Sequence, residues 1–415
     1  MPSPGDIVNR LTTLRRGAAT VNGWLPLLLA FSLPLSTSVI SVAALLILLL
    51  WLVEGNFAGK GREIMANPVC LALLAYLGLY LVGLLWTDNM AGGMAMLNKQ
   101  WKLALMPVFL TTVRYDWRRR YVAAFVAGMG VAVLLTYLAW FGLLHYSDIT
   151  PTHLTHGTFH VVYNPMLALA IYLVLHEILW GGRGRTARLG LAVLAALMIL
   201  DMFITEGRTG QLVFFVLMAL LLIQGLRRHL LLAVLLCLVL LPISFVAAYR
   251  LSPMFQQRVD QVRSEIAAFE VNPDTSVGLR LLFWRNSLEI IRAHPLFGVG
   301  TGDFQDAYAQ VNRVRSPAMV ATDNPHNQYV LVLCQFGLPG LVLLLALFAV
   351  QVRQAARIRD GWQRIRLAFP VFFLTIMLTE SYLVVYETGF LFSLLGAVFY
   401  KLPSPAASQE QNLPE

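Results

Sequence analysis

The feature that most constrains this chain is a succession of apolar runs, each close to the length that crosses a lipid bilayer. A hydrocarbon core of about 30 Å requires roughly 20 apolar residues in a helix. By this measure the sequence predicts about twelve spans, which lie at residues 21–37, 38–54, 68–86, 101–113, 120–144, 161–180, 187–205, 210–226, 229–250, 327–350, 365–382 and 385–400. Since 58% of the residues are hydrophobic and 13% are charged, we expect an all-α polytopic membrane protein.

The basic residues collect in alternate loops between these runs. Short cytoplasmic loops retain Lys and Arg, and the basic loops are the N-terminus, Lys60/Arg62, Arg114/Arg118/Arg119/Arg120, Arg183/Arg185/Arg188, Arg227/Arg228 and Arg353/Arg357/Arg359/Arg364/Arg366. The intervening loops carry few, with Lys99, Lys102 and Arg208 as exceptions. This pattern places both termini in the cytoplasm. The net charge of +9 is thus spread over short clusters and forms no continuous stripe, which argues against a nucleic-acid partner.

The same pattern divides the chain into four parts. We expect nine spans in residues 1–250, an external helical domain at 251–325, three spans at 326–401 and a disordered cytoplasmic tail at 402–415. In a Gram-negative cell the external domain would lie in the periplasm. The three cysteines are far apart and lie in or beside apolar runs, so they predict neither a disulfide framework nor a metal site.

The external segment contains three predicted helices. The first carries apolar residues at helical spacing from Phe255 to Phe269, the second runs from about Gly278 to His294, and the third begins near Phe304. In the second helix, Arg280 falls on one stripe with Trp284, Leu288 and Ile291. A cation on the face that packs on the membrane domain is costly unless an anion meets it. The glycines between the second and third helices follow no strand, so they predict turns and not a dinucleotide loop.

One polar cluster opens the span after the external segment. Asn324 suits a helix N-cap and Pro325 the first helical position, which places His326 in the first turn. There the helix dipole favours a neutral imidazole, which suits a general base. The alternative is a histidine that only caps the helix or lies at the membrane interface.

A second polar cluster, Glu206 to Gln211, forms a short external turn with an unexpected arginine. Arg208 could pair with Glu206 or Asp201, which is the commonest fate of such charges, or it could bind phosphate through bidentate donors. Arg208, Arg280 and His326 in one external pocket would supply two cations for a diphosphate and one base.

Other polar residues give weaker signals. The loop histidines at 145, 153, 156 and 160 could form a metal site, but their irregular spacing favours a solvated or glycan-contacting loop. Lys99 could contact phosphate or mark an interface, and Asp201 lies within a span, where a carboxylate is a functional candidate by default. We interpret Glu380 and Glu387 as structural. No Asp-x-Asp stands in an external loop, so the sequence does not indicate a metal-held diphosphate or another cofactor.

These residues together resemble a known family. The runs Arg280-Leu281-Leu282-Phe283-Trp284, His294-Pro295-Leu296-Phe297-Gly298-Val299-Gly300-Thr301-Gly302-Asp303-Phe304, Pro325-His326-Asn327 and Gly337-Leu338-Pro339-Gly340 look like the signature of O-antigen ligases and their polymerase relatives. The span number and the late external loop are similar too. In motif the resemblance covers about residues 206–340.

The resemblance implies a GT-C-like membrane glycosyltransferase of the bacterial inner membrane with a periplasmic active site. Its reaction would be an inverting, metal-independent transfer of glycan from undecaprenyl diphosphate to lipid A-core. His326 matches the catalytic base, Arg208 and Arg280 match the diphosphate-binding arginines, and Trp284 and Asn327 are supporting candidates. An O-antigen polymerase or a protein O-oligosaccharyltransferase would share these motifs. The modest external loop favours a ligase. A lipid-linked glycan transporter is the alternative of a different class. A transporter predicts functional charges near the bilayer midplane, whereas the unusual charges of this sequence lie at the external ends of spans.

Overall fold

The chain folds into a bundle of helices that carries a helical arch at one end. The computed structural model describes residues 4–144, 154–155 and 160–403, and within these ranges it contains helices and no strands. Eight helices, two of them with a short 3-10 turn, are long and apolar enough to cross a membrane. They are α3 (Thr37–Glu54), α5 with η1 (Pro68–Val82, Gly83–Trp86), η2 with α8 (Tyr115–Trp117, Arg118–Trp140), α9 (His160–Trp180), α10 (Arg185–Ile204), α11 (Arg208–Gly225), α12 (Leu230–Leu251) and α16 (Gln328–Arg357).

The remaining predicted spans correspond to shorter helices. The run at 21–37 is broken at Gly23, and the run at 101–113 changes helix at Leu105. The other helices of the bundle are α1 (Pro4–Asn22), α2 (Leu25–Ser32), α4 (Phe57–Met65), α6 (Met90–Ala104), α7 (Met106–Thr112), α17 (Gln363–Ile376) and α18 (Tyr386–Tyr400). Every residue of α18 from Thr388 to Tyr400 is buried, whereas only 6% of the α12 window is. A helix that is apolar on every side is typical of the protein interior. The apolar composition of α18 thus reflects its central position in the bundle.

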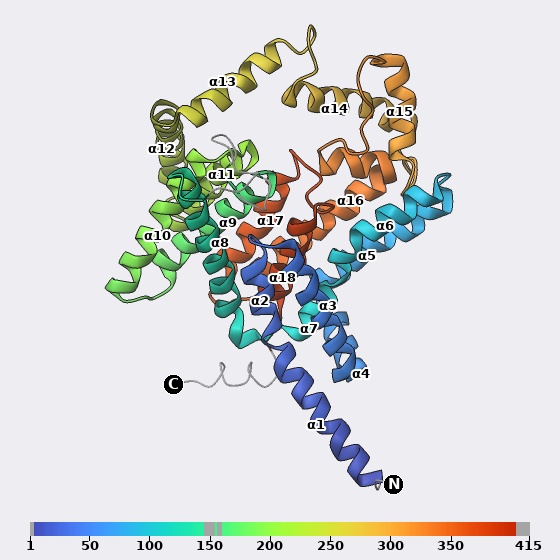
Figure 1. Ribbon diagram of the computed structural model, residues 1–415, viewed down its shortest axis with the longest axis vertical. Helices are drawn as coiled ribbons and strands as arrows, with labels where there is room; N and C mark the ends of the chain where they lie inside the picture. The colour runs from blue at the N-terminus through green and yellow to red at the C-terminus, as the bar shows by residue number, and fades with distance from the viewer. Residues whose placement is uncertain (1–3, 145–153, 156–159, 404–415) are drawn as a thin grey trace.

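The arch consists of α13 (Pro253–Ala267), α14 (Ser276–Ala293) and α15 (Phe304–Arg315), at the end of the molecule opposite to α1 (Figure 1). All three lie where the apolar spacing predicts helices. The stripe assigned to the second helix is wrong by about one position, because its buried residues are Gly278, Leu282, Phe283, Asn286, Ser287 and Ile290. Leu288 is exposed and Arg280 is half-buried. Arg280 therefore lies at the edge of the packed face.

Two of the sequence motifs join the arch to the bundle. Val299 and Gly300 in the turn after α14 donate backbone hydrogen bonds to the carbonyls of Cys334 and Gln335 in α16, at 2.8 and 2.9 Å. α16 is kinked at Gly337, whose φ is 59°. A Cβ there would lie 2.5 Å from the Leu296 backbone, so only glycine permits both this conformation and this contact. The glycines of both motifs thus serve the docking of the arch, in line with their interpretation as turn residues.

Two of the basic segments, at the start of α8 and the start of α17, meet through Asp360. Arg366 is fully buried and donates two hydrogen bonds of 2.5 Å to Asp360. Asp360 also accepts hydrogen bonds from Arg118 and from Tyr115. This cluster ties the start of α8 to α17, and Arg366 Nε adds a bond to the carbonyl of Phe399 in α18. One buried carboxylate therefore holds together three segments that are distant in sequence.

Replacement of Asp360 with asparagine is expected to lower stability by about 3–5 kcal/mol, because it leaves two largely buried arginines without their anion. Burial raises the pKa of the Asp360 carboxyl, but hydrogen bonds and charge from Arg366 and Arg118 outweigh this and hold the pKa below its usual value. The stabilisation of the fold by ionised Asp360 is complete above the ordinary carboxyl pKa. It is lost only as the pH falls through the lowered pKa of Asp360. Thermal unfolding in detergent at pH 7 measures the change.

Asp116→Asn is the matched control for this prediction. The Asp116 side chain pairs with Arg114 at 3.1 Å and is 62% exposed, and exposed ion pairs contribute about 0–1 kcal/mol. Equal unfolding midpoints for the Asp360 and Asp116 variants would contradict the structural role of the Asp360 cluster.

Candidate functional site

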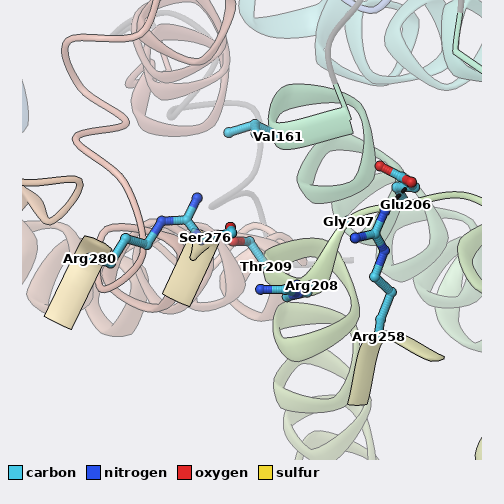
Figure 2. Close-up of a pocket in the computed structure, with 8 residues that line it drawn as sticks. All are labelled: Val161, Glu206, Gly207, Arg208, Thr209, Arg258, Ser276 and Arg280. Atoms are coloured by element: carbon cyan, nitrogen blue, oxygen red, sulfur yellow. Dashed lines mark hydrogen bonds and ion pairs between the residues drawn. The ribbon is translucent and has the colours of Figure 1, made fainter. Parts of the chain in front are cut away.

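A small cavity rich in arginine lies where the arch meets the bundle. It has a volume of about 70 Å³, enough for a few waters or a phosphate group by comparison with the roughly 10–15 Å³ that one water requires. Its lining residues are Val161, Glu206, Gly207, Arg208, Thr209, Arg258, Ser276 and Arg280. Figure 2 shows Arg208 and Arg280 extending toward one another from α11 and α14, with Arg258 on the far side of Arg208. Three guanidiniums against one carboxylate leave this cavity positively charged.

Arg208 retains free donor capacity inside the cavity. The sequence left open a pairing with Asp201, but Asp201 is fully buried and instead accepts a 2.5 Å hydrogen bond from Tyr163. Arg208 forms an ion pair with Glu265 of α13, with 3.9 Å between Nη2 and the carboxylate oxygen. Its Nη1 is buried and has no hydrogen-bond partner within the described residues. An unsatisfied buried donor is costly, so this atom suits an anionic ligand.

Gly207 permits the backbone turn that presents Arg208. Its φ is 153°, and a Cβ at this position would lie 2.4 Å from the Asn164 side chain. The turn therefore requires a residue without a side chain, both for its conformation and for its contact with α9.

Arg258 completes the cavity and was missed by sequence reasoning. It lies on α13 and pairs with Glu206. The amphipathic spacing of α13 makes Arg258 look like one charge of a solvated face. Only the docking of α13 against the turn at 206–209 makes it part of the cavity.

Arg280 has no ion pair or hydrogen bond among the residues that the structure describes. It is half-buried near the start of α14, and it faces the cavity opposite to Arg208 (Figure 2). A ligand of this guanidinium therefore displaces no contact with the described part of the chain.

His326 lies just before a helix and not in its first turn, which corrects the sequence interpretation. The N-cap of α16 is Asn327, whose side chain accepts hydrogen bonds from the amides of Tyr329 and Val330. His326 has a φ of 51°, an uncommon backbone conformation for a residue other than glycine. Asn324 supports it by accepting a 3.0 Å hydrogen bond from the His326 amide. The loop, and not the helix dipole, therefore positions the imidazole.

Glu380 is the direct partner of His326. The Glu380 carboxylate lies 2.5 Å from His326 Nδ1, and the imidazole stacks on Phe283 of α14 with ring centroids 5.9 Å apart. Glu380 lies 54 residues away from His326 in sequence, and no local motif joins the two, so the sequence does not predict this contact. Of the two side chains His326 is the accessible one, 34% exposed against 8% for Glu380. This arrangement leaves Nε2 without a hydrogen bond within the described chain.

Several donors hold Glu380 in its ionised form. Asn324 Nδ2 donates to it at 2.7 Å and the Ser381 amide at 2.8 Å. Burial raises the pKa of the Glu380 carboxyl, but the contact with His326 and these two hydrogen bonds outweigh it and leave the pKa below its usual value. A fixed carboxylate on Nδ1 selects the tautomer of the imidazole and stabilises its protonated form.

Two shared elements join the His326–Glu380 pair to the arginine cavity. Thr209, in the cavity wall, is hydrogen-bonded to Thr379, beside Glu380, at 2.8 Å. On α14, Phe283 lies one turn after Arg280, so the imidazole and the Arg280 backbone are on the order of 10 Å apart. The structure thus brings Arg208, Arg280 and His326 to one region.

The supporting candidates differ in their placement. Trp284 donates from Nε1 to the Pro325 carbonyl at 2.9 Å and so ties α14 to the His326 loop. Asn327 caps α16 and donates to the Leu378 carbonyl at 3.0 Å. Lys99 is exposed on α6 and does not line the cavity. The loop histidines at 145, 153 and 156, for which the sequence favours a solvated or glycan-contacting loop, lie outside the described residues, as does the side chain of residue 160.

An apolar cavity of about 590 Å³ adjoins the arginine cavity and shares two of its residues, Arg208 and Arg258. Its other walls come from α11, α12 and α13 and include Leu212, Phe215 and Phe245. α12 is the least buried of the candidate spans found in the described residues. Two cationic residues therefore stand at the end of an apolar channel that borders the membrane.

Comparison with known proteins gives a family match. Residues 192–345 match the family model described as O-Antigen ligase, a family of O-antigen ligases and related polymerases. The match confirms the family resemblance that the sequence motifs indicated. It includes Arg208, Arg280 and His326, but Glu380 lies beyond it. No curated protein matches this chain.

Proposed function

We propose that this chain is an O-antigen ligase of the bacterial inner membrane, which transfers glycan from undecaprenyl diphosphate to lipid A-core on the periplasmic side. The family match supports glycosyl transfer between a lipid-linked glycan and a lipid acceptor in general. The eight long apolar helices support a multi-pass membrane location. The observation that carries the proposal is the arginine cavity between the apolar channel and the His326–Glu380 pair.

The arginines would hold the donor diphosphate. Arg208 and Arg280 offer planar, bidentate donors, which match phosphate oxygens. Arg258 would add a third positive charge, although part of it is neutralised by Glu206. The polyprenyl chain of the donor would lie in the apolar channel, which begins at Arg208. This arrangement would place the sugar toward the His326 side of the cavity.

His326 would act as the general base. Its Nε2 would accept the proton of the acceptor hydroxyl while that oxygen bonds to the anomeric carbon from the face opposite to the diphosphate. The bond from the anomeric carbon to the diphosphate oxygen breaks, its electrons stay on the diphosphate, and the anomeric centre is inverted. Glu380 would stabilise the imidazolium, and the arginines would stabilise the departing charge without a metal.

The test is glycan transfer by the purified protein from undecaprenyl diphosphate to lipid A-core, with and without EDTA. Chelator-resistant transfer with inverted anomeric configuration is the expected result. Transfer only to a second lipid-linked glycan would identify a polymerase instead. Transfer only to Ser or Thr side chains would identify a protein O-oligosaccharyltransferase, and movement of the donor across vesicles without transfer would identify a transporter.

Replacement of Glu380 with glutamine is expected to lower kcat by about 10²-fold or more, because the neutral amide no longer stabilises the imidazolium. The KM for the donor should change little, since Glu380 does not line the arginine cavity. Steady-state transfer over a range of donor concentrations measures both kcat and KM. Glu387→Gln at the start of α18 is the control, and an equal loss in both variants would contradict the role of Glu380.

A further inference from the structure

A large cavity lies at the end of the bundle opposite to the arginine cavity. Its volume is about 500 Å³, and it is enclosed by α8, α9, α10 and the start of α17. Helix α9 contributes to both cavities, with Val161 lining the arginine cavity and His176 lining this one. At 1.5 Å per residue the two positions are roughly 22 Å apart along the helix. Figure 1 shows the linked ends of α9 and α10 on the side away from the arch.

The walls of this cavity are apolar and include small residues. Val126, Leu173 and Leu194 line it, and Ala127 and Gly190 leave space between the helices. A Cβ at Gly190 would meet no atom within 4 Å. Since α8, α9 and α10 are all candidate spans, the cavity lies where it can receive acyl chains from the surrounding membrane.

A buried histidine whose ring nitrogens have no hydrogen-bond partner in the described chain lines this cavity. His176 is 6% exposed, and in the described chain neither ring nitrogen has a hydrogen-bond partner. Its ring is held between Tyr172 and Trp180, with centroids at 6.3 and 5.0 Å. A neutral imidazole offers one donor and one acceptor, and leaving both unsatisfied costs free energy. This side chain is thus suited to a ligand with both donor and acceptor oxygens.

The rim of the cavity is cationic. Arg119 is exposed and has no ion pair within the described residues, and Arg183 is hydrogen-bonded to Glu177 at 2.6 Å. Glu177 is the one carboxylate among the lining residues. Arg364, stacked on Trp180 at 4.2 Å, lies next to the cavity. The net charge at the rim is therefore positive.

We propose that this cavity is a binding site for an anionic phospholipid of the leaflet opposite to the arginine cavity. The phosphate lies between Arg119 and Arg183, the acyl chains lie along α8 and α10, and His176 bonds to a headgroup or glycerol oxygen. Basic pockets between membrane helices take anionic headgroups. The apolar walls favour a lipid as the ligand, because free phosphate would contact only the cationic rim.

Native mass spectrometry of the purified protein with added lipids tests this site. Phosphatidylglycerol should be retained at least 10-fold more than phosphatidylethanolamine, and inorganic phosphate should not compete. Arg119→Ala should lower phosphatidylglycerol retention about 10-fold. The control is Arg120→Ala, because Arg120 is equally exposed but stacks on Trp117 at 4.7 Å outside the cavity.

Gly190→Leu provides a variant that places a side chain in the cavity, since an added Cβ at Gly190 meets no atom within 4 Å. It should abolish selective retention while the unfolding midpoint in lipid-free detergent stays that of wild type. Equal retention by the Arg119 and Arg120 variants, unchanged retention in Gly190→Leu, or displacement of the lipid by inorganic phosphate or undecaprenyl phosphate would each overturn the proposal. Because binding is measured without glycan transfer, its outcome is independent of the proposed ligase activity.

Discussion

His326→Ala is expected to lower the kcat for glycan transfer by about 10³-fold, within the roughly 10²- to 10⁴-fold that general base catalysis contributes. His326 is the accessible member of a pair whose buried partner, Glu380, fixes Nδ1, and its Nε2 has no hydrogen bond with the residues that the structure describes. Loss of the imidazole removes the acceptor for the hydroxyl proton but leaves the arginine cavity intact. The KM for the lipid-linked donor should therefore remain within about twofold of wild type, as measured by steady-state transfer to lipid A-core.

The folding of this variant needs a separate measurement, because alanine leaves the Glu380 carboxylate without its partner. His326→Gln keeps a hydrogen-bonding side chain at the position and should be as inactive as the alanine variant. His294→Ala is the matched control, since His294 is exposed at the end of α14 and outside the arginine cavity. Residual kcat within tenfold of wild type in a folded His326 variant would rule out the general-base role.

Arg280→Ala is the second change with a large expected effect, a loss of about 10²- to 10³-fold in kcat/KM, the range found when a donor to developing charge is removed. Arg280 faces the cavity from α14 and has no ion pair with any residue that the structure describes, so we expect its charge to act on the diphosphate. Both donor binding and departure of the leaving group should suffer. Arg280→Lys should recover only part of the loss, because an ammonium group lacks the planar bidentate geometry.

Arg285→Ala separates this effect from a general loss of positive charge on α14. Arg285 is exposed, pairs with Glu270 at 3.4 Å and does not line the cavity. Transfer rates of this control should be those of wild type. The diphosphate role of Arg280 would be untenable if both variants lost the same activity, or if Arg280→Ala changed neither KM nor kcat.

The sequence determined the helical membrane class and the individual chemical groups of the site. Apolar runs near 20 residues long predict membrane helices because the bilayer thickness sets that length, and eight long apolar helices are found. Three candidate residues could be selected because each stands out in its local sequence. Arg208 is a charge in a short external turn, and Arg280 is a charge on the apolar stripe of a predicted helix. His326 belongs to a polar cluster at the start of a span. The family match confirms the resemblance based on these motifs.

The tertiary structure alone decided which groups act on one another. Glu380 contacts His326 across 54 residues of sequence. Arg258 lines the same cavity as Arg208, about 50 residues away. No local spacing in the sequence encodes such contacts. The backbone of His326, the exact face of Arg280 and the central burial of α18 likewise depend on packing between helices. Local sequence fixes what a side chain can do, whereas packing of distant elements fixes its partners, its solvent exposure and hence its chemistry.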